Sequence, residues 1–286
     1  MFLPDRRRVL VPPISKPLVY QESLVDSIAV KSQPGLSSDA SKIYLRTSLL
    51  ADSAGSAYLE HQQHKILAVV NGPRSQKGSF SPSAKLLVDV KFMPLSSASN
   101  VVGIQQGGGH TSSLERSLSE YVYASVVPSI RLTQYPKSGI AISVVVISGS
   151  PSAAGLMKQV AAACVTVAGV ALVDAGIELT DIVTGCAVKF GAGVNDKVEL
   201  DLDSDGVPGD RPDIVGRGVV SYMAGRDEIT GFWFDDESPN ADSSNLVEST
   251  FVNVVTVATD GAKEVRKIVN SVLLQQVQLD DTVGTL

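Results

Sequence analysis

The clearest ligand spacing in the sequence lies in an acidic stretch of the C-terminal third. Asp201, Asp203 and Asp205 alternate and are followed by Gly206. An EF-hand calcium loop begins in this way, because alternate carboxylates supply oxygens to the ion and glycine permits the sharp turn. The twelfth position of such a loop carries a bidentate Glu, whereas Pro212 stands there in this chain. The stretch therefore indicates a solvated acidic loop, with a calcium-responsive module as an alternative.

The histidines and cysteines show no metal-ligand spacing. His61 and His64 lie near one end of an apparent strand, where we expect them to point to opposite faces, and His110 lies in a glycine-rich loop. All three are therefore expected at the surface. Cys164, inside an apolar run, is expected to pack as a small hydrophobic residue, and with Cys186 as the second cysteine no disulfide framework is possible. The sequence predicts no metal site, no cofactor and a reducing compartment.

General catalytic motifs are also missing. The sequence contains neither a Gly-x-Ser-x-Gly elbow nor a Gly-x-x-x-x-Gly-Lys-Ser/Thr phosphate loop. Residues 107–109 are three glycines, but they follow no predicted strand and open no helix, so they indicate flexible chain. These motifs alone leave the chemistry of the protein undetermined.

Charge is distributed unevenly along the chain. The net charge is −6, from 24 Lys and Arg against 30 Asp and Glu. Counted in thirds, residues 1–94 carry 12 basic and 7 acidic side chains, residues 95–194 carry 5 and 5, and residues 195–286 carry 7 and 18. Much of the acid falls in two loop-like blocks, 196–213 and 235–248. The total charge argues against tight nucleic-acid binding by this chain alone, but a basic N-terminal third can contribute to a composite surface.

The hydrophobic pattern predicts a mixed α/β chain (α+β) in which strands come first. Four early segments are typical of an antiparallel meander: residues 43–50, 55–60, 65–70 and 85–93. The middle of the chain predicts a helix over 114–126 ending before Pro128, and then a buried strand over 139–147. An almost wholly apolar helix over 156–175, closed by Gly176, follows. The last segments predict strands over 182–190, 219–223 and 228–234, and an amphipathic helix over 262–273 with Asp260 as its N-cap.

No signal peptide or membrane span is expected. The charge-free run at 138–157 is interrupted by Gly and Pro, and the run at 159–173 is shorter than the ~18–20 residues that cross a bilayer. Arg6, Arg7 and Arg8 precede only three apolar residues before Pro12. We therefore expect a soluble intracellular protein with no membrane partner.

Five segments of the chain form a characteristic series: Asp5-Arg6-Arg7-Arg8, residues 55–60, residues 65–80, residues 135–139 and residues 171–181. Taken in order, these segments resemble the RNase PH family of phosphorolytic 3′ exoribonucleases, and within it the ring subunits of the eukaryotic RNA exosome. The resemblance covers most of residues 5–275, with apparent insertions near 22–40, 95–113 and 201–214. It implies a single domain over residues 1–286 with an RNase PH-type (ribosomal protein S5 domain 2-like) fold, in which curved β-sheets pack around central helices.

The resemblance also implies partners. Family members of this kind form a six-membered ring around an RNA-sized channel, and RNA-binding cap subunits lie on the ring. The expected partners are therefore the other ring subunits, the cap subunits and single-stranded RNA. The expected role is RNA processing, including rRNA processing, and RNA degradation, in the nucleus and nucleolus and also in the cytoplasm.

The family's catalytic residues are not matched. Active members place a Gly-Ser/Thr-Arg phosphate loop just before the central helix, and the position of that Arg falls near Ala161 here, with Lys158 as the nearest cation. A lysine does not supply the planar fork of an arginine. Active members also carry two Asp residues six apart, where this chain has Pro212 and Gly218. Three further carboxylates lie close enough to be displaced by an insertion: Asp205, Asp210 and Asp213. The resemblance thus implies a non-catalytic subunit, with an active phosphate-dependent 3′–5′ exoribonuclease as the alternative.

Three basic residues are candidate RNA contacts. Arg74 and Lys77 follow a predicted strand, and Arg116 opens the helix near the place where active members carry a pair of phosphate-gripping arginines. Contacts of this type are made to the phosphate backbone and depend on salt rather than on sequence. The alternative is that these side chains are solvated surface charges or form salt bridges between subunits.

Overall fold

The computed structural model describes residues 43–61, 64–93, 113–148, 154–191, 198–200, 214–236 and 248–283. The chain divides into two units, Met1–Ser37 and Ser38–Leu286, and every described residue lies in the second. The N-terminal motif at 5–8 and nearly all of the apparent insertions lie outside the described residues. The expectation of one domain over residues 1–286 therefore stays a prediction.

The first sheet has five strands in the order β1-β2-β3-β5-β4. Their bounds are Ile43–Thr47 (β1), Gly55–His61 (β2), His64–Ser75 (β3), Lys85–Phe92 (β4) and Ser138–Ser148 (β5). Strands β1 to β3 form the predicted meander, but the prediction is wrong for β4, which pairs in parallel with β5 rather than with β3. A parallel pair requires a crossover connection, and α2 (Ser113–Val126) supplies it, followed by two short 3₁₀ turns, Val127–Ser129 and Leu132–Gln134.

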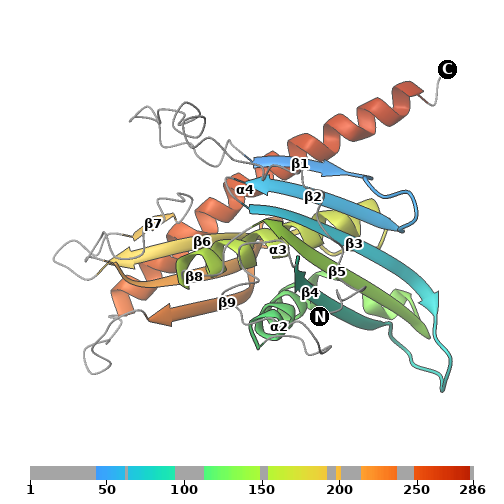
Figure 1. Cartoon of the computed structure of the whole chain (residues 1–286), viewed down its shortest axis with the longest axis horizontal. Helices are drawn as coiled ribbons and strands as arrows, with labels where there is room; N and C mark the ends of the chain where they lie inside the picture. The colour runs from blue at the N-terminus through green and yellow to red at the C-terminus, as the bar shows by residue number, and fades with distance from the viewer. Residues whose placement is uncertain are drawn as a thin grey trace, which may run out of the picture. The chain divides into compact units, whose positions relative to one another are not determined.

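Helix α3 (Ala154–Asp174) lies between the two sheets (Figure 1). It packs against β2 and β3 on one side and against β6 (Val183–Gly191) and β8 (Ile214–Met223) on the other, which explains why it is apolar almost all round. The stretch Met157–Asp174 is long and apolar enough to cross a membrane by length and composition, but most of it is buried inside the fold, as in a core helix. Gly176 ends the helix at φ 66°, as predicted.

The second sheet has four strands in the order β7-β6-β8-β9, and all its pairs are antiparallel. The bounds are Val183–Gly191 (β6), Val198–Leu200 (β7), Ile214–Met223 (β8) and Glu228–Asp236 (β9). Helix α4 (Glu248–Val283) covers the face of this sheet opposite α3 and runs on past β1 (Figure 1). The buried residues of α4 follow helical spacing: Val254, Ala258, Ala262, Val265 and Val269.

The predicted start of the last helix is wrong. Asp260 lies inside α4 rather than at its N-cap, because the helix already begins at Glu248. Gly261 follows, and a Cβ at that position would lie 2.6 Å from Cys186 Sγ. The Asp-Gly pair therefore marks a close approach of α4 to β6 and not a helix boundary.

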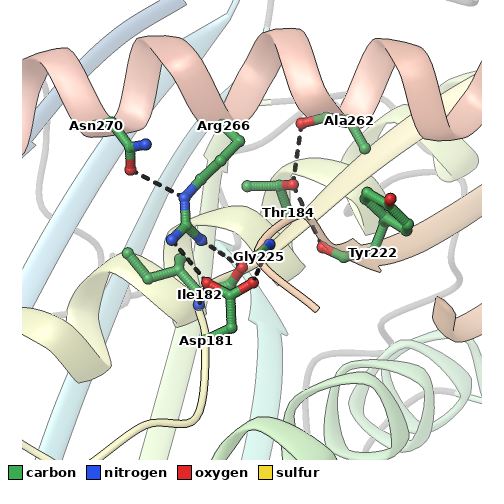
Figure 2. A network of polar contacts seen from close by, with 8 residues as sticks. All are labelled: Asp181, Ile182, Thr184, Tyr222, Gly225, Ala262, Arg266 and Asn270. Carbon is green, nitrogen blue, oxygen red and sulfur yellow. Dashed lines mark hydrogen bonds and ion pairs between the residues drawn. The ribbon is translucent and has the colours of Figure 1, made fainter. Parts of the chain in front are cut away.

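A polar network joins α4 to the second sheet (Figure 2). Arg266 donates to Asp181 Oδ1 (2.7 Å), to the carbonyl oxygen of Ile182 (2.6 Å) and to Asn270 Oδ1 (2.9 Å). Asp181 Oδ2 accepts the backbone N–H of Gly225 at 2.7 Å. One ion pair thus connects the helix, the entry to β6 and the turn between β8 and β9.

Candidate nucleic-acid interface

An open groove lies where β3 ends and where β4 and β5 begin. Three lysines line it, Lys77, Lys85 and Lys137, together with Tyr123 of α2 and several serines. Among the described residues, no Asp or Glu lines this groove. In a chain of net charge −6, this is a local concentration of positive charge beside hydroxyl donors, which suits the phosphates of a nucleic-acid backbone.

The wall of the groove is held by backbone hydrogen bonds. Lys137 donates its N–H to the carbonyl of Ser81 (2.9 Å) and accepts the N–H of Gln76 (3.0 Å), and Ala84 donates to Leu132 (2.9 Å). Lys137 adopts φ 54°, a left-handed conformation that costs a non-glycine residue about 1 kcal/mol. The two hydrogen bonds of Lys137 offset that cost and hold the loop between β3 and β4 at its start and at Ser81.

Of the three predicted RNA contacts, the structure places only Lys77 in the lining of this groove, and neither Arg74 nor Arg116 lines it. Arg74 is exposed near the end of β3, where it pairs with Gly139 of β5, and Lys77 lies in the groove lining. Arg116 is exposed on α2 but does not line the groove. Helical geometry places it on the same face as Tyr123, about 10 Å along the axis, with Glu120 between them.

Sequence reasoning missed three residues of this region. Phe80 is 73% exposed in the loop between β3 and β4, and Lys85 and Lys137 enter the groove from two other segments. A lone aromatic residue in a stretch of Gly, Ser and Pro, close to Arg74 and Lys77, was the available signal for Phe80, because exposed rings beside cations stack bases. Only the fold shows that Lys137 lies beside Lys77.

At the position where the family's phosphate-binding cation is expected, Lys158 is enclosed by the protein and forms an internal ion pair. The Lys158 side chain is 0% exposed, and its Nζ lies 2.7 Å from Asp235 Oδ2 and 3.2 Å from the centroid of the Trp233 ring. Ala161, where the family's Arg is expected, is buried in α3. At Gly218 in β8, a Cβ would lie 1.9 Å from the Phe234 ring, so a carboxylate side chain would require that ring to move. Residues 201–213, with Pro212 and the three displaced Asp candidates, lie outside the described residues.

The prediction for two of the histidines is wrong. His61 and His64 belong to successive antiparallel strands and are paired directly, so their side chains lie on the same face. His64 is 1% exposed and its Nε2 lies 3.0 Å from Gln159 Oε1. Burial lowers the pKa of His64, and the Gln159 contact opposes that shift. No group of three His, Cys, Asp or Glu side chains that could hold a metal occurs among the described residues.

Cys164 and Asp174 both have structural roles in or beside the core. Cys164 is fully buried in α3, and burial raises the pKa of its thiol. Asp174 accepts the backbone N–H of Ser56 at 2.7 Å and also binds Ser48, so it holds the turn between β1 and β2 against the end of α3. A Cβ at Gly55 would lie 2.3 Å from the Ala175 backbone nitrogen. Residues 55–60 and 171–181, two of the segments that carry the family resemblance, therefore position β2 on α3.

Two sheets packed around a central helix form an α/β domain, and comparison with known proteins identifies its type. Residues 40–178 match the family model described as 3′ exoribonuclease family, domain 1. The chain belongs to this RNase PH family, as the sequence predicts. It is 31% identical to the exosome complex component mtr3 of Schizosaccharomyces pombe, over 94% of this chain and 96% of the relative. It is 30% identical to MTR3 of Chaetomium thermophilum, over 85% and 90%.

Solved structures agree on the fold. Rice Rrp46 superposes with a TM-score of 0.60 at 14% identity, covering 81% of this chain and 94% of Rrp46. The Archaeoglobus fulgidus exosome with RNA bound to the active site superposes with a TM-score of 0.56 at 11% identity, covering 79% and 87%. The predicted RNase PH-type fold of curved sheets around central helices is confirmed.

Proposed function

We propose that this chain is a non-catalytic subunit of the six-membered RNase PH-like ring of the RNA exosome. It would scaffold the ring and help to guide single-stranded RNA for 3′–5′ processing and degradation. The observation that carries the ring assignment is the similarity to two fungal exosome components over almost their whole lengths. The proposed partners are the other RNase PH-like ring subunits and the RNA-binding cap subunits, in the nucleus and nucleolus and also in the cytoplasm.

The non-catalytic part of the proposal has its support in two positions. Phosphorolysis requires a cationic cradle that is open to inorganic phosphate. In this chain Lys158 is enclosed and paired with Asp235. Gly218 lies against Phe234, where an active member would carry an Asp. An active phosphate-dependent 3′–5′ exoribonuclease is the second candidate, because the family model that matches is itself a 3′ exoribonuclease model.

Co-expression with the other ring subunits tests the assembly. We expect the full chain to enter the ring in one copy, as measured by native mass spectrometry. Exclusion of the chain from every assembled ring would overturn the assignment.

A separate assay tests catalysis. The full chain, alone and in the ring, is incubated with single-stranded RNA, inorganic phosphate and Mg²⁺. We expect no release of nucleoside diphosphates that depends on this chain. Phosphate-dependent release by the chain alone would establish the exoribonuclease instead.

A further inference from the structure

A serine-rich loop forms one wall of the basic groove. It connects β3 to β4 (Figure 1) and contributes Ser79, Ser81 and Ser83 to the groove lining. Ser81 is exposed and is followed by Pro82. In the part of the chain that the structure describes, no other Ser or Thr precedes a proline. A proline disfavours the helical conformation in the residue before it, so the loop presents one hydroxyl in an exposed Ser-Pro segment that favours extended backbone.

Ser81 is held beside the groove lysines. Its carbonyl oxygen accepts the backbone N–H of Lys137 at 2.9 Å, and its hydroxyl donates to the carbonyl oxygen of Ser83 at 2.8 Å. The lysines Lys77, Lys85 and Lys137 are all exposed. Among the described residues, no Asp or Glu forms an ion pair with them. The groove has a volume of about 560 Å³, which leaves room for a phosphate group beside the ammonium groups.

We propose that Ser81 is a phosphorylation site for a proline-directed serine kinase, and that its phosphate occupies the groove in place of an RNA phosphate. The proposal rests on the proposed RNA-guiding function and adds a means of regulating it. Phosphoserine carries about −1.5 to −2 charge at pH 7 and three acceptor oxygens. The lysines that bind RNA therefore pair with the phosphate on Ser81 instead.

The phosphoryl group comes from a nucleoside triphosphate. The Ser81 oxygen forms a bond to the γ-phosphorus as the bond from that phosphorus to the bridging oxygen breaks, and the nucleoside diphosphate leaves. The hydroxyl proton passes to a carboxylate of the kinase. No oxidation or reduction takes place.

The modification is tested on the full chain. A mitogen-activated protein kinase, which recognises Ser-Pro segments, is added with MgATP, and fragmentation of the tryptic peptide 78–85 in mass spectrometry locates the phosphate. We expect phosphate on Ser81. The matched control is Pro82→Ala, which keeps the hydroxyl but removes the proline, and labelling of Ser81 should fall strongly in it. No phosphate on Ser81 of the unsubstituted chain, or equal labelling in Pro82→Ala, would overturn the proposal.

The contact between the phosphate and the lysines has a readout of its own. The second pKa of the phosphate on Ser81 is followed in the full chain by ³¹P NMR. This pKa is about 6 in an isolated phosphoserine, and neighbouring ammonium groups favour the more charged form and lower it. We expect the pKa to rise again in Lys77→Met/Lys137→Met. An equal pKa in the two proteins would overturn the site.

Phosphorylation should then weaken RNA binding by the assembled ring. If the phosphate takes two lysines, at about 0.7 counterion each, the slope of log affinity against log salt concentration falls by roughly 1.4 and the affinity at about 0.1 M salt falls roughly 25-fold. The matched control is a phosphate installed on Ser53, which lies between β1 and β2 and outside the groove lining, because it adds the same charge elsewhere. Equal losses for both phosphates would contradict the proposal.

The two proposals fail in different ways. RNA binding by the unmodified ring that does not depend on salt would contradict the RNA-guiding function. An unchanged phosphate pKa in the lysine variant would contradict only the Ser81 site.

Discussion

Two polar side chains at the start of α3 are matched by residues far away in the sequence. Lys158 is paired with Asp235 of β9, and Gln159 meets His64 of β3 at 3.0 Å. Buried polar groups need such partners, because an unpaired group loses its hydration without compensation. The middle layer of the fold is therefore held to both sheets by specific contacts as well as by apolar packing.

His64 makes the stability of the fold depend on pH. Burial lowers its folded pKa below the ordinary value of 6.5, which the unfolded chain keeps. The contribution of the neutral imidazole is therefore fully present above about pH 6.5 and is lost as the pH falls toward the folded pKa, with a slope of at most about 1.4 kcal/mol per pH unit. Urea unfolding from about pH 7.5 to 5 should show a steeper fall for the wild type than for His64→Gln. Parallel curves would contradict this role.

Residue-level prediction succeeded where the signal is local. Gly176 follows the last apolar residues of a helix, and this spacing alone predicts that it ends the helix, where the structure gives it a left-handed φ of 66°. The family resemblance implied that Lys158 is the cation nearest to the expected phosphate position, but nothing near Lys158 in the sequence indicates that Asp235 pairs with it. The His61–His64 error has the same origin, since only strand pairing shows that the chain turns back between them.

At the scale of elements, the sequence predicted the types of helix and strand better than their bounds and partners. The last helix begins at Glu248 rather than near residue 262, because packing on β6 tolerates the Asp-Gly pair inside it. Strand β4 has an ordinary apolar pattern, yet its parallel partner β5 follows only after α2. Pairing order depends on contacts distant in sequence, which local periodicity does not encode.

The Arg266–Asp181 pair should be the main polar attachment of α4 to the second sheet. The two side chains are 16% and 8% exposed, so Asp181→Ala leaves a largely enclosed guanidinium without its carboxylate. We expect a loss of about 3 kcal/mol in the free energy of unfolding, measured by urea denaturation of the full chain. The control is Glu178→Gln, which breaks an exposed pair of the same length with Arg131. That control should cost less than about 1 kcal/mol in the free energy of unfolding. Equal losses in the two variants would show that the enclosed Asp181 pair contributes no more to stability than the exposed Glu178 pair.

For RNA binding by the whole molecule, the charge of the local surface matters more than the net charge of the chain. The net charge of −6 is the sum of a basic N-terminal third and an acidic C-terminal third, and the fold gathers Lys77, Lys85 and Lys137 in one groove. Counting charges along the sequence predicted the basic third, and their place after a predicted strand made Arg74 and Lys77 candidate RNA contacts. It did not show the groove, because the loop after β3 and the segment before β5 meet through contacts distant in sequence, such as the hydrogen bonds at Lys137. An acidic chain can thus present one face suited to RNA within a larger assembly.

This arrangement predicts how RNA binding by the assembled ring depends on salt. Each lysine that contacts a phosphate releases about 0.7 counterion from a single strand. Lys77→Glu/Lys137→Glu should therefore reduce the slope of log affinity against log salt concentration by roughly 1.4, in fluorescence anisotropy with labelled single-stranded RNA. Phe80→Ala should weaken binding by about 1–3 kcal/mol with the slope unchanged, because stacking releases no counterions.

The matched control for the two groove lysines is Lys91→Glu. Lys91 lies on β4, is 62% exposed and pairs with Asp89 at 3.0 Å, and it does not line the groove. Its substitution changes the total charge by the same amount per residue, so a general electrostatic effect would lower the slope in this variant too. A slope that falls only for the groove pair would place the phosphates beside Lys77 and Lys137, since counterion release reports contacts and not net charge.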